Sequence, residues 1–557
     1  MTKPRTHMLI LFFVALLIYN ANFRAIGTGD SIPTSLIPIV LLTRGNIVMN
    51  EFNKYYSGPS GTPYFFHETK FGYLPTYPLA TGILLTPFYI IPVYWLAANN
   101  PTISDWVHFA RNAEKISASV ITAVSAALFY LLAIQLGASF RAAFVVSLSY
   151  AFASEAWSTS SQALWQHGPG IFFMLLAGSL ALRQMENPTT RRAIFLGLAC
   201  GVAVAIRPTN ILFIFLLYLW MIKKCPLYFT AYTVPAAILA SLLLGYNYIV
   251  FGSVRGRYTG PFNMPVLDGL KGLLFSPGRG LLLYFPLALF GPLGFCYAMH
   301  NRVRYMSFYS VLMAFVVLQV VLVSKWHMWW GGWSFGPRML TEIQPMLLLL
   351  SLPFFALPIN KYKKWIGFYI LLIWCLSVQF VGASIFPAGN WNSSPTNVDK
   401  TPSRLWDWKD NPVSRDVSTI GYRYRVKPKP LSDYKATYDV NPKIIISLPG
   451  ETKDLSVLVT NTSSEPWPNF GKLDGSEIVH LSYHIVDHHG KMLRYDGNRV
   501  GFNRVVWPGE SMLLSLPVQA PLTAGQYAVE ISLVQEGVAW FDDKGISPAK
   551  VDIIVKK

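Results

Sequence analysis

Long apolar segments alternate with short polar connections along most of this chain, and Lys and Arg cluster in every second short connection. The apolar segments lie near residues 7–24, 114–135, 141–156, 168–184, 192–206, 208–222, 227–250, 281–299, 305–324, 340–358 and 365–385. The basic connections contain Lys3 and Arg5, Arg141, Arg183 with Arg191 and Arg192, Lys223 and Lys224, Arg302 and Arg304, and Lys361, Lys363 and Lys364. Because cytoplasmic connections of membrane proteins carry an excess of Lys and Arg, this pattern predicts a bundle of about eleven transmembrane helices with a cytoplasmic N-terminus.

The composition excludes a soluble globule for residues 1–385. Of the 557 residues, 52% are hydrophobic and only 13% are charged, a balance typical of membrane proteins. The formal net charge of +18 could indicate nucleic acid, but the cytoplasmic clusters account for part of it. Much of the remaining positive charge lies in connections that should face outward, and the insertion of a membrane protein does not require positive charge there. We therefore expect an anionic ligand and no nucleic acid. The cysteines are Cys200, Cys225, Cys296 and Cys375; all lie in or beside apolar segments and imply no disulfide framework.

The first apolar run can be interpreted as a signal peptide or as an uncleaved transmembrane helix. It is followed by Asn20, Asn22 and Arg24, which make a poor small-residue cleavage site. We therefore expect an uncleaved helix.

The apolar stretch 74–98 is long enough to cross a membrane, but we expect that it does not. An outward Asp30 and an inward Arg141 require an odd number of crossings between them, and the segment 114–135 supplies one. The stretch also contains four prolines, Pro75, Pro78, Pro87 and Pro92, and proline bends or breaks helices. The sequence predicts broken helices here, which either lie at the outer interface or dip into the membrane and return. It predicts a similar short surface helix at 32–43.

The chain changes character after residue 385. A polar linker, about 386–435, leads into a region, 436–557, of short runs with alternating hydrophobicity. The strand-like runs are 443–448, 455–461, 478–487, 512–518, 527–535 and 551–555. Short strands separated by turn residues predict an all-β immunoglobulin-like sandwich. The predicted span count places this domain outside a plasma (inner) membrane, in the periplasm or extracellular space.

Carboxylates in the first outward connection are candidates for proton transfer. Asp30 lies in a Gly-Thr-Gly-Asp-Ser turn directly after the first segment, which suits a general base acting on an acceptor hydroxyl. Asp30 could equally be an N-cap for the helix that begins near Pro33. Glu51 and Glu68 lie in the same connection and are candidates for a second acid–base group, or solvated loop residues.

Outward cations form the second group of candidates. Lys and Arg side chains at helix ends can extend to lipid phosphates without a specific function. Together they resemble a pocket for a phosphorylated substrate, because Arg offers paired donors to phosphate oxygens. The members are Lys70, Arg207, Arg255, Arg257, Arg279 and Arg338, with Arg279 inside a Ser-Pro-Gly-Arg-Gly loop.

Aromatic and histidine side chains in the outward connections have two interpretations. The Trp residues, including Trp165 and Trp330, could form an interfacial belt or stack against sugar faces. His167 and His327 are candidates for binding the acceptor or sugar. No ligand-spacing motif indicates a metal site, so no metal or cofactor is expected, although a divalent metal stays possible.

These residues resemble, in their order along the chain, those of membrane glycosyltransferases of the GT-C class. The resembling group contains protein O-mannosyltransferases, the lipid A aminoarabinose transferase and related enzymes that use polyprenyl-phosphate sugars. The matching elements are Gly29-Asp30, Lys70 before a proline-containing stretch, Trp165-Gln166-His167-Gly168-Pro169, Arg207-Pro208, Ser276 to Leu281, and Trp330 to Arg338. The chain departs from the group at Ser31, where the mannosyltransferases have Glu, and keeps the Lys-Pro-Pro pattern only loosely.

The resemblance implies a GT-C-like bundle over about residues 5–385 and an inverting transfer. Asp30 would be the catalytic base, and Lys70 would contact the phosphate of a polyprenyl-phosphate-sugar donor. Arg207, Arg257, Arg279 and Arg338 would share the negative charge of the leaving phosphate. The acceptor would be a hydroxyl of a glycan, lipid or protein on the extracytoplasmic face.

Two functions from other classes compete with this expectation. A flippase or transporter of lipid-linked saccharides requires ionisable groups inside the bundle, and the predicted spans carry almost none below their outer ends. A glycan-assembly factor without transferase activity would use the bundle as an anchor only, which leaves the outward cations unexplained.

Overall fold

The structure is a computed structural model that describes residues 3–25, 27–57, 61–257, 260–356, 361–387, 391–393, 397–425, 428–471 and 476–556. The chain divides into two compact units. Unit 1 comprises Met1–Gly331 and Phe335–Ser384, and unit 2 comprises Gly332–Ser334 and Ile385–Lys557. The side chains of four lysines in the predicted cytoplasmic connections, Lys3, Lys361, Lys363 and Lys364, lie outside the described part.

Unit 1 is a helical bundle with one small hairpin. Its first half contains α1 (Lys3–Asn20), α2 (Ile32–Arg44), α3 (Asn50–Tyr56), β1 (Phe66–Thr69), β2 (Gly72–Pro75), α4 (Ala80–Ala97), α5 (Ile103–Gln135), α6 (Phe140–Ala153), η1 (Ala156–Ser160) and α7 (His167–Glu186). Its second half contains α8 (Thr190–Ile206), η2 (Pro208–Asn210), α9 (Ile211–Lys224), η3 (Pro226–Tyr228), α10 (Phe229–Phe251), α11 (Val266–Phe275), α12 (Leu281–Tyr284), η4 (Pro286–Leu289), α13 (Phe290–His300), α14 (Met306–Ser324), η5 (Arg338–Leu340), α15 (Ile343–Ser351), η6 (Leu352–Ala356) and α16 (Lys361–Ser384).

Several long apolar helices indicate a multi-pass membrane protein, but the predicted count of eleven spans is not supported. Among the described residues, five helices are long and apolar enough to cross a membrane: Ala80–Ala97, Ile103–Gln135, Pro226–Phe251, Met306–Ser324 and Trp365–Ser384. Several other predicted segments form shorter or interrupted helices. The segment 281–299 divides into α12, η4 and α13, because Pro286 begins a 3-10 turn inside it.

The prediction of broken helices at 74–98 is wrong for most of that stretch. The structure forms one continuous helix, α4, with Pro87 and Pro92 inside it. By length and composition α4 is one of the five candidate spans. The predicted short helix at 32–43 is present as α2, and its residues from Pro33 to Val40 are buried against the rest of the unit. The two helices pack together, and α2 contributes Leu36, Ile37 and Val40 to a shared apolar core.

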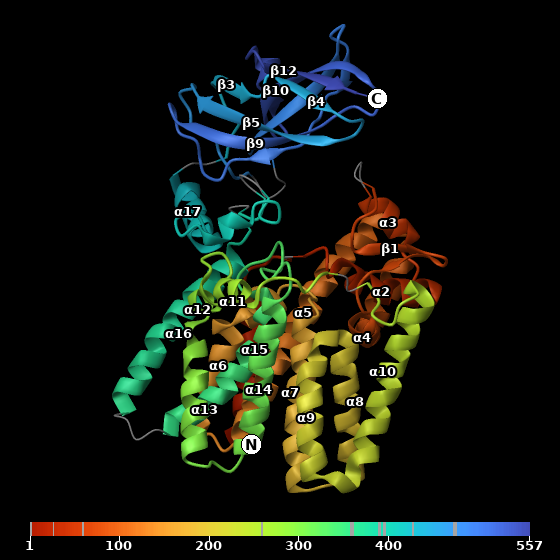
Figure 1. Ribbon diagram of the computed structural model, residues 1–557, viewed down its shortest axis with the longest axis vertical. Helices are drawn as coiled ribbons and strands as arrows, with labels where there is room; N and C mark the ends of the chain where they lie inside the picture. Colours follow the sequence, from red (N-terminus) through yellow and green to blue (C-terminus); the bar gives the residue numbers. More distant parts are fainter. Residues whose placement is uncertain are drawn as a thin grey trace. The chain divides into compact units, whose positions relative to one another are not determined.

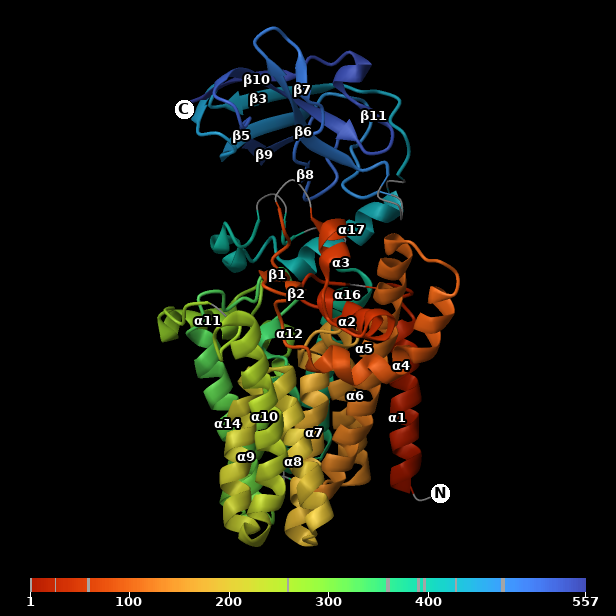
Figure 2. The same cartoon turned by 90° about the vertical axis from the view of Figure 1, so that its right-hand side faces the viewer.

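The basic connections of unit 1 gather at the end of the bundle that holds the N-terminus (Figures 1 and 2). Arg304 pairs with Glu186 at 3.2 Å, which joins the α13–α14 connection to the end of α7. The guanidinium of Arg141 lies 5.1 Å from the ring centroid of Trp365, near the start of α16. The α2 and α3 helices, the β1–β2 hairpin and α11 lie at the opposite end (Figures 1 and 2). The predicted cytoplasmic clusters of basic residues are therefore segregated at one end of the bundle.

Unit 2 contains a sandwich of two sheets. Its strands are β3 (Ala436–Asn441), β4 (Ile444–Ser447), β5 (Thr452–Asn461), β6 (Val479–Asp487), β7 (Met492–Arg494), β8 (Val500–Gly501), β9 (Ser511–Gln519), β10 (Gly525–Gln535), β11 (Ala539–Trp540) and β12 (Ala549–Val555), with η8 (Asp542–Lys544) after β11. One sheet has the order β4-β12-β10-β6-β7 and the other β3-β5-β9. Alternate residues of both sheets, such as Val457 and Ile531, share one apolar core. All six predicted strand-like runs are strands.

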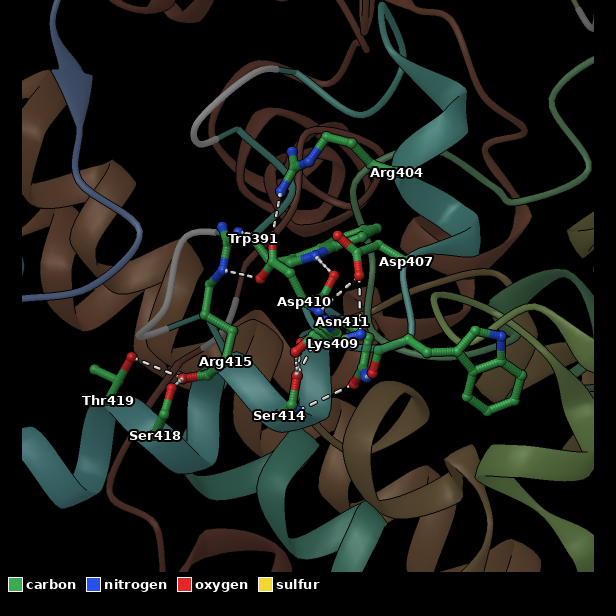
Figure 3. A network of polar contacts seen from close by, with 11 residues as sticks. Trp391, Arg404, Asp407, Lys409, Asp410, Asn411, Ser414, Arg415, Ser418 and Thr419 are labelled. Carbon is green, nitrogen blue, oxygen red and sulfur yellow. Dashed lines mark hydrogen bonds and ion pairs between the residues drawn. The ribbon is translucent and has the colours of Figure 1, made fainter. Parts of the chain in front are cut away.

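The predicted linker 386–435 has regular structure. It contains η7 (Pro402–Trp406) and α17 (Pro412–Arg425). Figure 3 shows the polar network that joins them. Arg415 donates from Nε to Asp410 Oδ1 at 2.7 Å, and Trp391 Nε1 donates to the Asp410 carbonyl at 2.8 Å. These contacts hold together part of the segment 386–435, whose composition is typical of a linker.

Candidate functional site

Asp30 lies in the turn between α1 and α2, where three side chains donate to its carboxylate. The hydroxyls of Tyr64 and Tyr77 each donate to Oδ1 at 2.9 Å. Arg338 donates from Nη1 to Oδ2, also at 2.9 Å. Ser31, not Asp30, occupies the N-cap position of α2. The capping interpretation of Asp30 is therefore wrong, and its carboxylate belongs to a polar cluster.

The turn requires glycine directly before Asp30. A Cβ atom at Gly29 would lie 2.3 Å from the Tyr64 hydroxyl oxygen, a distance that side-chain atoms do not tolerate. Glycine therefore allows Tyr64 to approach the backbone and reach the carboxylate.

The two tyrosines flank the β1–β2 hairpin. Phe66 pairs with Pro75 at its base and Thr69 pairs with Gly72 at its tip. Tyr64 and Tyr77 lie just beyond the base, so Asp30 joins both ends of the hairpin. Lys70 lies at the tip, exposed, with Nζ 5.1 Å from the Phe71 ring centroid. At about 3.3 Å per strand residue, the tip is roughly 10 Å from the base.

Arg338 connects Asp30 to two other loops. It begins η5, after the loop 325–337 that follows α14. Its guanidinium carbon lies 4.1 Å from the ring centroid of Trp165, and Nη2 donates to the Gly331 carbonyl. Positive φ angles at Gly331 and Gly336, 74° and 61°, let the loop fold back toward the site.

Asp30 stays ionised in this environment. Burial raises its pKa, but the charge of Arg338 and the three donated hydrogen bonds outweigh burial and hold the pKa below its usual value. A carboxylate stabilised in this way is a weaker base than a free one, because each donor favours the charged form.

A second polar cluster centres on Glu342. His167 Nδ1 and Arg207 Nε both lie 2.7 Å from Glu342 Oε1. Nearby, the hydroxyl of Thr341 donates to Glu155 Oε2 at 2.7 Å. Glu155 and Glu342 are fully buried. The structure therefore brings His167 and Arg207 together, but Arg207 is paired with a carboxylate.

Arg279 is also engaged within the protein. It is fully buried, and it donates from Nε to the Trp330 carbonyl at 3.2 Å and from Nη1 to the Gly278 carbonyl at 2.8 Å. Trp330 packs edge-on against Trp329. These contacts fix the Ser-Pro-Gly-Arg-Gly loop against the loop that leads to Arg338.

Other predicted site residues lie in different surroundings. Glu51 pairs with Arg44 at the surface, and Glu68 is exposed on β1. Arg257 donates to His67 of the hairpin. His327 lies near the loop after α10, where its backbone N–H donates to the Pro261 carbonyl at 3.1 Å. None of these contacts joins the Asp30 cluster directly.

Sequence reasoning missed two ionisable residues of α5. Glu114 is buried and accepts from the Leu164 N–H at 3.0 Å, directly before Trp165. Lys115 donates from Nζ to the Tyr19 carbonyl and to Gln162 Oε1, both at 2.7 Å. Both residues lie at the outer end of the predicted span 114–135, so the expectation of almost no charge below the outer ends of the spans still stands as a prediction. The signal was present, because a Glu-Lys pair within an apolar segment is costly unless it has a role.

Comparison with known proteins identifies no family for this chain. No protein-family model matches the sequence, and no curated protein matches it. Within the described ranges, no group of three or more His, Cys, Asp or Glu side chains could hold a metal ion.

Proposed function

We propose that this protein is an inverting membrane glycosyltransferase. It moves a sugar from a polyprenyl-monophosphate donor to an acceptor hydroxyl of a glycan, lipid or protein on the extracytoplasmic face of the plasma membrane. One observation carries the proposal: the ionised Asp30 carboxylate lies beside Arg338 at the end of the bundle opposite the basic connections. A base and an anion-binding cation in one place suit this transfer.

The reaction is a single displacement. The acceptor oxygen attacks the anomeric carbon as Asp30 removes its proton. The new carbon–oxygen bond forms while the bond from the anomeric carbon to the phosphate oxygen breaks, with inversion. Polyprenyl phosphate leaves as an anion and needs no proton. A well-placed cationic donor contributes about 3–4 kcal/mol to stabilising such a charge in the transition state.

A helical unit with several candidate membrane spans and a C-terminal β-sheet region are consistent with a GT-C-like bundle and an immunoglobulin-like domain. The β1–β2 hairpin, α2 and the turn between α1 and α2 lie at the same end of unit 1 (Figure 2). In unit 2, the orders β12-β10-β6 and β3-β5-β9 agree with the G-F-C and A-B-E sheets of immunoglobulin-like domains.

The proposal is tested in the host cell by mass spectrometry of surface glycans and polyprenyl lipids. Cells without the protein should lack one sugar on one acceptor and accumulate its polyprenyl-phosphate form. Wild-type protein should restore the sugar, whereas Asp30→Asn should not. Glu186→Gln, a matched change in an ion pair at the other end of the bundle, should restore it. Full restoration by Asp30→Asn would remove Asp30 from the reaction.

Transport of a lipid-linked saccharide is a second candidate function, favoured by the buried Glu114 and Lys115 of α5. Ionisable side chains inside a bundle mark substrate paths in many transporters. The alternative predicts that purified protein in vesicles moves a labelled lipid-linked sugar between leaflets, and that Lys115→Met abolishes this movement. Sugar transfer without leaflet exchange would exclude it.

A further inference from the structure

Arg338 differs from the other cations that were predicted to bind a donor phosphate. Arg207 lies on the buried Glu342, and Arg279 is fully buried against backbone carbonyls. The side chain of Arg338 keeps 12% of its surface exposed, and its partner Asp30 keeps 24%. Lys70 and Arg257 lie on or against the exposed hairpin. Arg338 is therefore the cation that contacts the candidate base and is still within reach of a ligand.

The contacts of Arg338 leave one of its three donor nitrogens without a hydrogen bond. Nη1 donates to Asp30 and Nη2 to Gly331. Nε is buried and has no hydrogen-bond partner among the residues that the structure describes, which is unusual for a buried donor. The Trp165 ring supports the face of the guanidinium.

Two demands on Arg338 conflict in this geometry. A phosphate-bearing donor needs the guanidinium, because paired N–H groups match phosphate oxygens. A catalytic Asp30 needs to be relieved of the same guanidinium, because its charge weakens the carboxylate as a base. Both demands are met when the phosphate replaces Asp30 as the principal partner of Arg338.

We infer that Arg338 is an anion-operated switch on Asp30, in which the phosphate of a polyprenyl-phosphate donor draws the guanidinium from the carboxylate. The inference rests on the proposed function and adds its regulation. Tyr64 and Tyr77 donate to the other carboxylate oxygen, so they keep Asp30 in position after Arg338 turns away. Asp30 becomes an effective base only when the donor is bound. The donor must therefore bind before the acceptor can react.

Competition for one guanidinium has a thermodynamic consequence that does not depend on catalysis. If Asp30 and phosphate compete for Arg338, removing the Asp30 charge strengthens phosphate binding, because binding and ion pairing are reciprocally linked. If Asp30 instead only holds Arg338 in its binding position, removing that charge weakens phosphate binding. The sign of the change separates the switch from a structural role.

The test measures equilibrium binding of polyprenyl phosphate to the full-length protein in nanodiscs. Parallel arms use inorganic phosphate and unphosphorylated polyprenol. Asp30→Asn should tighten binding of polyprenyl phosphate by roughly tenfold, and Arg338→Gln should weaken it. In the Arg338→Gln background, Asp30→Asn should have little further effect, which separates the switch from simple charge repulsion. Glu186→Gln should leave the affinity unchanged.

The outcomes distinguish the switch from the function on which it rests. Unchanged or weaker polyprenyl phosphate binding by Asp30→Asn overturns the switch and leaves the proposed transfer standing. Equal tightening by Asp30→Asn with and without Arg338 also overturns it, since repulsion then explains the effect. A wild-type protein that binds polyprenol as well as polyprenyl phosphate overturns both, because the phosphate is then not recognised. Binding of inorganic phosphate without binding of polyprenyl phosphate would contradict a lipid-linked phosphate as the ligand.

Discussion

At the residue scale, the site is built from short-range polar contacts around one carboxylate. Asp30 receives donors from two hairpin tyrosines and from Arg338, and Arg338 in turn stacks on Trp165. The sequence indicates Asp30, Arg338 and Trp165 as candidates, because each follows or precedes an apolar segment. It does not indicate Tyr64 or Tyr77, since a tyrosine in an aromatic-rich loop has no distinguishing pattern.

The acid limb of the pH profile of the transfer rate at limiting donor concentration, which reports the free enzyme, should lie below the usual range for an aspartate. Arg338 and the tyrosines lower the pKa of Asp30, so the carboxylate stays ionised as the pH falls toward that lowered value. Arg338→Gln should move the limb to higher pH, because burial then acts with less opposition. Transfer rates across pH 3–8, about the range in which a shifted carboxyl titrates, check this. If Arg338→Gln leaves the acid limb at the same pH, Asp30 is not the group whose titration limits the transfer rate.

The same shift predicts a direction for folding stability. A carboxyl group whose pKa is lowered in the folded state adds stability above its unfolded pKa and loses it as the pH falls through the folded value. The wild type should therefore lose more thermal stability on acidification than Asp30→Asn does. Thermal unfolding in detergent at pH 7 and at about pH 3 measures the difference. Equal losses in both proteins would contradict an ion pair at Asp30.

At the element scale, the helices and strands that differ most from the sequence-based expectation are those whose formation depends on contacts with residues far along the chain. Alternating hydrophobicity located β4, β5, β6, β9, β10 and β12 of unit 2 but not β3. Each of the six located strands has one face in a shared core. The four-residue strands of the β1–β2 hairpin are too short for such a pattern. The prolines of α4 suggested helix breaks, yet the helix continues through Pro87 and Pro92. The sequence alone does not show that a helix tolerates these prolines.

The hairpin should depend on its two tyrosines. Replacing Tyr64 and Tyr77 together with Phe removes both donors to Asp30 Oδ1 and loosens the base of the hairpin. We expect transfer to fall by roughly tenfold or more, on the scale of losing a charge-assisted hydrogen bond, about 1.5–3 kcal/mol. Tyr73→Phe, in the same hairpin, is the matched control. Equal rates for the double variant and the control would show that the tyrosines are not needed.

Glu114 of α5 should stabilise the fold next to the Asp30 cluster through its hydrogen bonds. Its carboxylate accepts from the Leu164 N–H, and the Ser31 side chain is also bonded to it. Glu114→Ala leaves a buried N–H unsatisfied and should destabilise the protein by about 1–3 kcal/mol. Glu114→Gln keeps an acceptor oxygen and should cost less. Thermal unfolding of both variants in detergent measures the order, and a more stable Ala variant would contradict it.

At the scale of the whole molecule, every donor to Asp30 described above belongs to unit 1. Charge segregation and apolar length were readable from the sequence, because membrane insertion imposes both on composition. The buried Glu114, Glu155 and Glu342 were not placed by sequence, since their partners come from segments far along the chain. The β-sandwich has its own core and supplies none of these contacts.

The sandwich should therefore be dispensable for the chemical step. A protease site inserted between α17 and β3 allows the full-length protein to fold before the sandwich is removed. We expect the cleaved protein to transfer sugar to a small soluble acceptor at the rate of the uncleaved protein. An uncleaved protein carrying the same insertion is the control. Loss of transfer on cleavage would assign unit 2 a part in catalysis.

The central claim is that Asp30 removes the acceptor proton during sugar transfer from polyprenyl phosphate. The most direct measurement is the single-turnover transfer rate of purified wild type and Asp30→Asn, each saturated with labelled donor. The account predicts a loss of roughly a hundredfold or more in the rate, while binding of polyprenyl phosphate is not weakened. A variant that transfers sugar at the wild-type rate with donor bound would contradict the account.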